Sequence, residues 1–238
     1  MTRAVFFDVD FTLIYPGPTF RGEGYQQFCA RHGISVDASR FEVAVAAASA
    51  VLDEARDHIY EAALFHRYTA AIITGMGGEG PAVKACAEEI YDEWAACRHF
   101  ELYDDVAAAL RSIAAQSIRI GLISNSHRCL ASFQSHFELE DLITAAVSSS
   151  EHGYMKPHPS IFEAALRLID VPAPDAVMVG DSLTHDIDGA IQAGMRAVLV
   201  RRSADIGPGC ASPAHGRPGV AIIRSLEELP AMLQHDRV

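Results

Sequence analysis

Residues 4–13 read AVFFDVDFTL, an apolar run that ends in two acids. The four residues AVFF predict a buried strand, because a run that is apolar on both faces suits a parallel sheet covered on both sides. Asp8 and Asp10 follow where this strand should end, and alternate residues of an extended chain point to the same side. Two carboxylates that close raise each other's pKa or need a cation. The stretch therefore predicts a charged site at the end of a buried strand.

Short apolar runs recur along the chain, and helical patterns lie between them. These runs are 118–124, 144–147, 176–179, 197–200 and 220–223. Helices are predicted to begin near Asp104, Ser126, Pro159 and Thr184. Ser225 and Glu228 have the spacing of a capping box at the start of a last helix. Strands that alternate with helices predict an α/β fold with a doubly wound parallel sheet, a Rossmann-like core.

Residues 16–97 interrupt this alternation, since they contain no clear strand and much Ala, Glu and Leu. The segment is far longer than one crossover between parallel strands requires. We therefore expect an α-helical domain at 16–97, inserted into a catalytic core formed by 1–15 and 98–238. Gly75–Gly80 fits the pattern G-x-G-x-x-G of a dinucleotide loop. The preceding segment looks helical, which favours a loop between two helices of the insertion instead.

Composition excludes several classes of function. The net charge is −12, from 31 acids against 19 Lys and Arg, whereas a nucleic-acid or anionic membrane partner would require a basic face. The five cysteines form no C-x-x-C pair, so reduced thiols are expected rather than zinc ligands or a disulfide framework. No apolar run is long enough for a membrane span, and the first is too short for a signal peptide. We expect a cytoplasmic protein.

Polar residues gather at the predicted strand ends. In open α/β sheets, ligands bind beyond the carboxyl ends of the strands, so these residues should face one crevice. They are Asp8 and Asp10 after the first strand, Ser124 and Asn125 after the second, and Asp181, Ser182 and Asp186 after the run 176–179. Lys156 lies in a loop that could reach the same crevice.

The residue types indicate the chemistry of this crevice. Asp8, Asp10 and Asp181 offer hard oxygen ligands, which suit Mg²⁺. The hydroxyl of Ser124, the backbone N–H of Asn125 and the ammonium group of Lys156 suit an anion. Metal, lysine and hydroxyl around a carboxylate nucleophile are typical of phosphoryl transfer. Each of these residues taken alone is typical of a helix cap, a turn or a solvated side chain. The prediction of phosphoryl transfer therefore depends on their all lying at the ends of predicted strands.

Four motifs in this arrangement resemble those of the haloacid dehalogenase superfamily. They are DVDFTL at 8–13, SN at 124–125, KPHP at 156–159 and GDSLTHD at 180–186. The resemblance extends over residues 4–200, and the insertion is similar to that family's helical cap of the first type. It implies that Asp8 is the nucleophile and forms an aspartyl-phosphate. It also implies that Asp10 acts as general acid and then base, and gives its backbone carbonyl to Mg²⁺.

The same resemblance assigns the remaining site residues. Ser124 and the Asn125 amide would bind phosphate, and Lys156 would hold the nucleophile and the transferred group. Asp181 would ligate the metal. Thr12, Ser182 and Asp186 would surround and support these groups, with Asp186 either a ligand itself or a partner of one.

The second acid of the first motif separates branches of this family, because dehalogenase branches lack an acid at the position of Asp10. We therefore expect a Mg²⁺-dependent phosphatase acting on a small phosphomonoester. A phosphomutase using the same aspartyl-phosphate and a non-catalytic binding protein on the same scaffold are the alternatives. Phe11 stands where the family most often has Gly, and we expect it to keep a negative φ. His152, His158 and His185 lack zinc-ligand spacing and are expected to support nearby loops.

Overall fold

The computed structural model describes residues 1–54, 56–202 and 217–234, and these form two compact units. One comprises Met1–Tyr15 with residues 102–202 and 217–234, and the other comprises Pro16–Glu101. Within the described residues, the chain passes from one unit to the other at β2 (Ile14–Pro16) and returns at β3 (Phe100–Leu102), which form a two-stranded sheet. Residues 203–219 are rich in Gly and Pro, which predicts an irregular surface loop, and most of them lie outside the described residues.

The first unit is built on a six-stranded sheet in the order β5-β4-β1-β6-β7-β8. Its strands are β1 (Ala4–Phe7), β4 (Arg119–Ser124), β5 (Ile143–Ser148), β6 (Ala176–Gly180), β7 (Arg196–Val200) and β8 (Ala221–Ile223). All neighbouring pairs are parallel. Every residue of β1 and β6 is buried, which explains why both strands are apolar throughout. The predicted doubly wound parallel sheet is confirmed.

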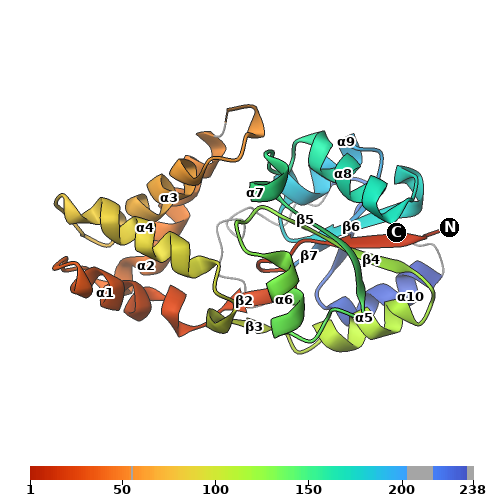
Figure 1. Ribbon diagram of the computed structural model, residues 1–238, viewed down its shortest axis with the longest axis horizontal. Coiled ribbons are helices and arrows are strands. Elements are labelled where there is room, and N and C mark those ends of the chain that lie inside the picture. The colour runs from red at the N-terminus through yellow and green to blue at the C-terminus, as the bar shows by residue number, and fades with distance from the viewer. Residues whose placement is uncertain (55, 203–216, 235–238) are drawn as a thin grey trace. The chain divides into compact units, whose positions relative to one another are not determined.

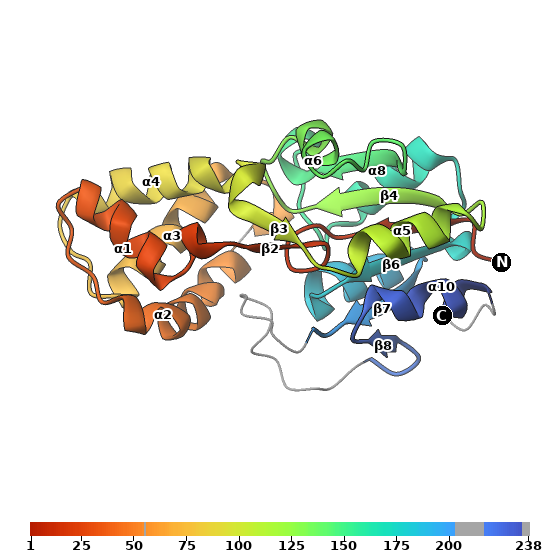
Figure 2. The ribbon, with the colours of Figure 1, turned by 90° about the horizontal axis from the view of Figure 1, so that it is seen from below.

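Helices cover both faces of this sheet, with α8 (Pro159–Ile169) and α9 (Gly189–Gln192) on one face (Figure 1). The opposite face carries α5 (Val106–Ala114) and α10 (Leu229–Gln234), which lie over the strands in Figure 2. The unit also contains α6 (Leu130–His136), α7 (Ser149–His152) and a π-helix at Leu183–Asp188 that leads into α9. Among the described helices, none combines the length and apolar character needed to cross a membrane.

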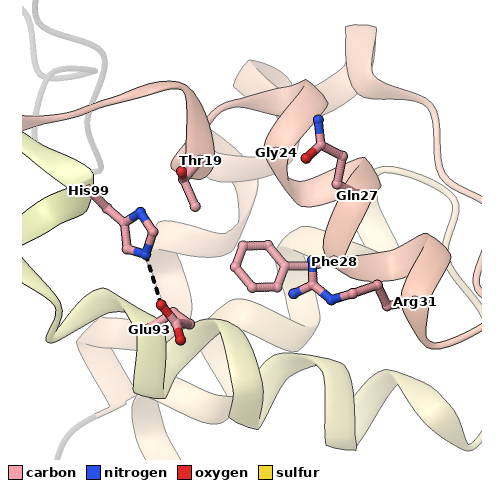
Figure 3. A pocket seen from close by; sticks show the side chains of 7 residues that line it. All are labelled: Thr19, Gly24, Gln27, Phe28, Arg31, Glu93 and His99. Carbon is pink, nitrogen blue, oxygen red and sulfur yellow. Dashed lines mark hydrogen bonds and ion pairs between the residues drawn. The ribbon is translucent and has the colours of Figure 1, made fainter.

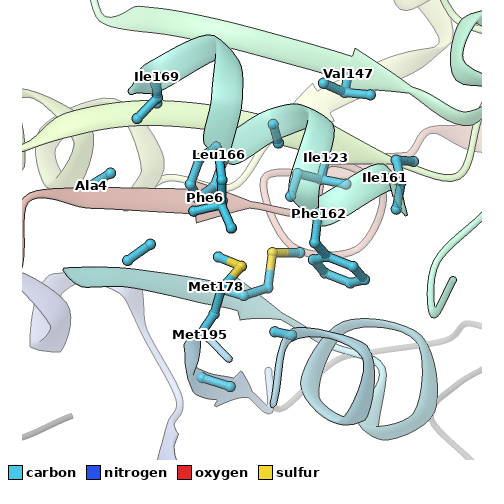
Figure 4. Close-up of a cluster of buried hydrophobic side chains, with 14 of the residues drawn as sticks. Ala4, Phe6, Ile123, Val147, Ile161, Phe162, Leu166, Ile169, Met178 and Met195 are labelled. Atoms are coloured by element: carbon cyan, nitrogen blue, oxygen red, sulfur yellow. The ribbon is translucent and has the colours of Figure 1, made fainter. Parts of the chain in front are cut away.

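Helix α8 shows why this sequence packs on the sheet. Its buried residues are Ile161, Phe162, Ala165, Leu166 and Ile169, a spacing that places them on one helical face. They meet Phe6, Ile123 and Met178 of the strands in a single apolar cluster (Figure 4). Pro159 occupies the first turn, where a missing N–H costs nothing. The helix ends at Asp170, whose backbone is left-handed.

The C-terminal helical segment is fixed by a carboxylate of the core. The predicted capping box is confirmed, since Ser225 and Glu228 exchange the two expected hydrogen bonds. Asp105 accepts hydrogen bonds from Ser225 Oγ at 2.8 Å, from the Leu226 N–H at 2.8 Å and from Arg202 Nη1 at 3.0 Å. These bonds tie the segment to the start of α5.

The second unit is helical, as the absence of strand patterns predicts. Its helices are α1 (Gly22–Arg31), α2 (Phe41–Ala48), α3 (Ala62–Gly75) and α4 (Ala82–Trp94), with short 3₁₀ turns between them. Phe20 packs on Trp94 and Phe100 with ring centroids 4.6 Å and 5.5 Å away. The glycine-rich stretch joins α3 to α4, so it is a loop between helices and not a dinucleotide loop after a strand.

Candidate active site

The predicted site residues of the first unit lie at the carboxyl ends of three adjacent strands. Asp8 follows β1, Ser124 ends β4, and Asp181 follows β6, while β1 pairs with both of the others. Ligands of open α/β sheets bind beyond the carboxyl ends of the strands, so these residues lie where a ligand would bind.

Lys156 joins two of the predicted acids. Its Nζ lies 2.5 Å from Oδ1 of Asp8 and 2.7 Å from Oδ1 of Asp186, and it donates to the carbonyl of Ile123 at 2.8 Å. All three charged side chains are buried. Two hydrogen bonds and an ion pair therefore hold the ammonium group in place. This position orients the Asp8 carboxylate.

The cluster carries more negative charge than one lysine can offset. Burial raises the pKa of Asp8 to about 7, with Lys156 opposing and Asp186 adding to this shift. Burial also lowers the pKa of Lys156, but the Asp186 and Asp8 carboxylates outweigh that effect and hold it above its ordinary value. Oxygens of Asp8, Asp181 and Asp186 lie within 4.8 Å of one another. A buried set of three carboxylates fits a hard divalent cation such as Mg²⁺.

A glycine makes the close approach of Asp186 possible. The Ser182 N–H donates to Asp186 Oδ2 at 3.0 Å, and the Asp186 N–H returns a bond to the Ser182 carbonyl at 3.0 Å. A Cβ at Gly180 would lie only 2.2 Å from Asp186 Oδ2, so any larger residue there would displace the carboxylate. Ser182 Oγ in turn caps the π-helix by accepting from the His185 N–H at 3.1 Å. Ser182 therefore supports the Asp186 carboxylate.

The side chains of Ser124 and Asn125 have different surroundings. The Ser124 hydroxyl is buried, and it has no hydrogen-bond partner among the described residues. A buried hydroxyl in this state is available to a ligand. The Asn125 side chain instead holds the lysine loop, since its Nδ2 donates to the Lys156 carbonyl at 2.9 Å and its Oδ1 accepts from the Lys156 N–H at 2.7 Å. Sequence reasoning assigned only the Asn125 backbone amide and missed this second role.

The expectation of a negative φ for Phe11 is wrong, because its φ is 66°. The hydrogen bonds of the turn that contains Phe11 determine this backbone conformation. The Phe11 N–H donates to the Ile14 carbonyl at 2.7 Å, while the Leu13 N–H donates to the Val9 carbonyl at 2.9 Å. These bonds require a left-handed residue at the tip, where the family commonly has Gly. Thr12 next to it is fully buried, and its carbonyl accepts from Arg202 Nη2 at 2.9 Å.

The carboxylate of Asp10 is not part of the Asp8–Asp181–Asp186 group. It faces Arg128, whose Nη1 lies 3.0 Å from both of its oxygens. The Arg128 side chain is fully buried, and that of Asp10 is 18 % exposed. Sequence reasoning missed Arg128, and the one available signal was its position three residues after the SN motif.

The helix predicted to begin near Ser126 begins later, at Leu130. Ser126 Oγ accepts from the Arg128 N–H at 3.0 Å, so this serine closes a turn ahead of the helix and does not cap it. The cap is Cys129, whose Sγ accepts from the Ser132 N–H at 3.5 Å. The delay of one helical turn is what gives Arg128 a non-helical position near Asp10.

The three histidines near the motif loops contact serines. His152 Nε2 and His158 Nδ1 both lie 2.8 Å from Ser160 Oγ at the start of α8. His185 Nδ1 lies 3.3 Å from Ser182 Oγ.

The helical unit has a pocket of its own, of ≈ 260 Å³ (Figure 3). Thr19, Gly24, Gln27, Phe28, Arg31, Glu93 and His99 line it. His99 Nε2 lies 2.8 Å from Glu93 Oε2, and the Arg31 guanidinium lies 4.4 Å from the centre of the Phe28 ring. None of the predicted catalytic residues lines this pocket.

The parallel sheet, with buried carboxylates and a lysine beyond its strand ends, is a Rossmann-like fold with a charged site where such folds bind ligands. A sequence model of the haloacid dehalogenase-like hydrolase family matches residues 2–194, and the chain belongs to this family. The predicted resemblance is confirmed.

Individual relatives come from several branches of the family. The chain is 32% identical to N-acylneuraminate-9-phosphatase of Homo sapiens, over 98% of this chain and 94% of the relative. It is 28% identical to glyceraldehyde 3-phosphate phosphatase of Methanopyrus kandleri, over 85% of each chain. The solved structure of 2-haloacid dehalogenase from Pseudomonas syringae pv. Tomato DC3000 is similar with a TM-score of 0.64 and 28% identity, covering 99% of both chains.

Proposed function

We propose that this protein is a Mg²⁺-dependent phosphatase that hydrolyses a small phosphomonoester through an aspartyl-phosphate on Asp8. The observation that carries the proposal is the Lys156 ammonium group between Asp8 and Asp186, at 2.5 Å and 2.7 Å. It orients one carboxylate oxygen of Asp8 and leaves the other for attack. The two relatives named as phosphatases support the same activity.

Phosphoryl transfer depends on positioning and on charge stabilisation. In the proposed mechanism a carboxylate oxygen of Asp8 attacks phosphorus while the bond to the alcohol oxygen breaks. The Ser124 hydroxyl, the Asn125 N–H and the Lys156 ammonium group bind the phosphate oxygens. Asp8, Asp181 and the backbone carbonyl of Asp10 would hold Mg²⁺, with Asp186 as a further ligand or support. The cation would neutralise charge on the phosphate and on the crowded carboxylates.

Asp10 supplies the proton transfers that an ester of an alcohol needs. It gives a proton to the leaving oxygen as Asp8 attacks, and it then takes a proton from the water that cleaves the aspartyl-phosphate. A halide needs no proton to leave, so a dehalogenase has no use for this acid. Asp10 therefore favours phosphatase chemistry despite the structural similarity to a 2-haloacid dehalogenase.

We propose further that the helical unit, Pro16–Glu101, is a cap that selects the substrate. The names of the two phosphatase relatives describe phosphate on a primary carbon of a small metabolite. A primary phosphomonoester of this kind is the substrate class we propose. The acidic charge and the free thiols of Cys29, Cys86, Cys97 and Cys129 suit a cytoplasmic enzyme.

A panel of phosphorylated metabolites scored by release of inorganic phosphate tests this function. The panel includes N-acylneuraminate 9-phosphate, glyceraldehyde 3-phosphate, sugar phosphates and p-nitrophenyl phosphate. We expect Mg²⁺-dependent release that stops in EDTA, and no release by the Asp8→Asn variant. Transfer of phosphate within a sugar without release would identify a phosphomutase. Binding of metabolites without any turnover would identify a non-catalytic protein.

A further inference from the structure

Among the described residues, Arg128 is the largest buried charged side chain that the proposed mechanism does not use. Its side chain has no exposed surface, and its Nη1 donates to both oxygens of Asp10 at 3.0 Å. Removing a guanidinium group from water is costly unless it is paired. The two residues are 118 positions apart in the sequence, so the pair is a product of the fold rather than a local contact.

The segment that carries Arg128 is itself fixed. The Arg128 N–H donates to Ser126 Oγ at 3.0 Å, and the Ser126 carbonyl accepts from the Ser150 N–H at 3.4 Å. Two positions before Ser126, Ser124 provides the hydroxyl proposed to bind phosphate. A donor on such a segment, equidistant from both carboxylate oxygens, restricts rotation of the Asp10 carboxylate.

We infer that Arg128 is a positioning residue that holds the carboxylate of Asp10 in the orientation needed for proton transfer. The inference rests on the proposed function, in which Asp10 exchanges protons with the leaving oxygen and with water. A proton-transfer group must come within about 2.6–3.2 Å of its target. A displacement of about 1 Å can cost on the order of 10²-fold in rate. Arg128 acts through Asp10 and makes no contact with substrate.

The leaving group of the substrate separates this role from a general structural one. An alkyl alcohol leaves only with a proton, whereas nitrophenolate leaves without one. We expect Arg128→Met to slow kcat on a primary alkyl phosphate by about 10–100-fold, with KM changed by less than about threefold. On p-nitrophenyl phosphate, the first turnover should release nitrophenolate near the wild-type rate. Turnover should then slow, and intact mass should show phosphorylated protein, because the water step also needs Asp10.

Two further variants test whether the effect passes through Asp10. Arg128→Lys keeps a charged donor and should recover part of the alkyl-phosphate rate. In an Asp10→Asn background, Arg128→Met should change neither substrate's rate further, because the group that Arg128 positions is already inactive. Arg196→Met is the control for removing a partly buried arginine, since Arg196 donates to Thr2 Oγ1 at the amino end of the sheet. It should leave both rates unchanged.

Contrary results have distinct meanings. Equal slowing of the alkyl substrate and of the nitrophenolate burst, with a raised KM, would place Arg128 on the phosphate and overturn the inference. A further loss in the Asp10→Asn background, or wild-type rates in both Arg128 variants, would also overturn it. Thermal unfolding identifies a variant that does not fold, and Arg128→Lys then carries the test. No phosphate release by the wild type, or full release by Asp8→Asn, would refute the proposed function instead.

Discussion

The Asp8→Asn substitution should stabilise the metal-free protein, although it removes the proposed nucleophile. Asp8 is buried among Asp181, Asp186 and a single lysine, and its pKa is raised from 3.8 to about 7. Between these two pH values the folded chain binds a proton that the unfolded chain has released. The free energy of unfolding therefore falls as pH rises through this window. The stabilising contribution of the Asp8 proton is fully present below pH 3.8 and is lost above pH 7.

The size of this loss follows from the pKa. Each pKa unit corresponds to about 1.4 kcal/mol, so a rise from 3.8 to about 7 corresponds to at most about 4 kcal/mol. Asn cannot ionise, yet its amide oxygen can still accept the hydrogen bond from Lys156. The variant should match the wild type near pH 4 and exceed it in stability by a few kcal/mol at pH 8.

Urea unfolding of both proteins in EDTA, from pH 4 to pH 8, measures this difference. Asp141→Asn, which replaces an exposed acid, should follow the wild type at every pH. Mg²⁺ should restore stability to the wild type mainly at pH 8, because the cation binds the ionised carboxylate, and should have less effect on Asp8→Asn. A stability difference that is the same at pH 4 and pH 8 would refute the reasoning.

Three other substitutions or deletions test the rest of the site. Asp181→Asn should weaken Mg²⁺ binding at least about tenfold in calorimetric titration with the fold retained, and an unchanged affinity would exclude it as a ligand. Replacing residues 20–97 by a short linker should preserve hydrolysis of aryl phosphates and reduce selectivity among metabolites; equal selectivity would show that the helical unit does not choose the substrate. Phe11→Val should be less stable than Phe11→Asn by about 1 kcal/mol in urea, because Asn tolerates a left-handed backbone and a β-branched residue does not. Equal stabilities would mean that the turn does not require a left-handed residue at position 11.

The strands of the parallel sheet could be predicted because each is a separate apolar run. All residues of AVFF and AVMV are buried, so these strands could be predicted from their own apolar residues without knowledge of the rest of the fold. The short strands β2 and β3 have three residues each, too few to show a period. They pair where the chain leaves and re-enters the first unit, and no local pattern marks that place.

The helix boundaries of the second unit could not be read from its sequence. Residues 38–74 contain no Gly or Pro, so no residue type marks a break. Helix α2 nevertheless ends at Ala48 and α3 begins only at Ala62. Asp57 and His58 between them adopt positive φ angles of 51° and 55°. Helix propensity is weak, and packing between helices overrides it here.

The φ of Phe11 cannot be predicted from its residue type alone, because the hydrogen bonds of the turn determine it. Left-handed backbone costs a non-glycine residue about 1–2 kcal/mol, which makes a negative φ the natural expectation. The turn contains three hydrogen bonds that close on Val9 and Ile14, and they define its geometry together. Their sum exceeds the cost at one residue.

Arg128 escaped prediction because its partner is distant in the sequence. An arginine in a turn is expected to be exposed to solvent when no acidic residue is close in the sequence. The acidic partner of Arg128 is Asp10, which is 118 positions away. Parallel pairing of β1 with β4 aligns Phe7 with Leu122 and so brings the turns after both strands to the same edge of the sheet. The motifs that follow the strands identify which residues react. The register between β1 and β4 decides which buried charged groups contact those residues. In this protein it brings Arg128 to Asp10, and this contact orients the Asp10 carboxylate.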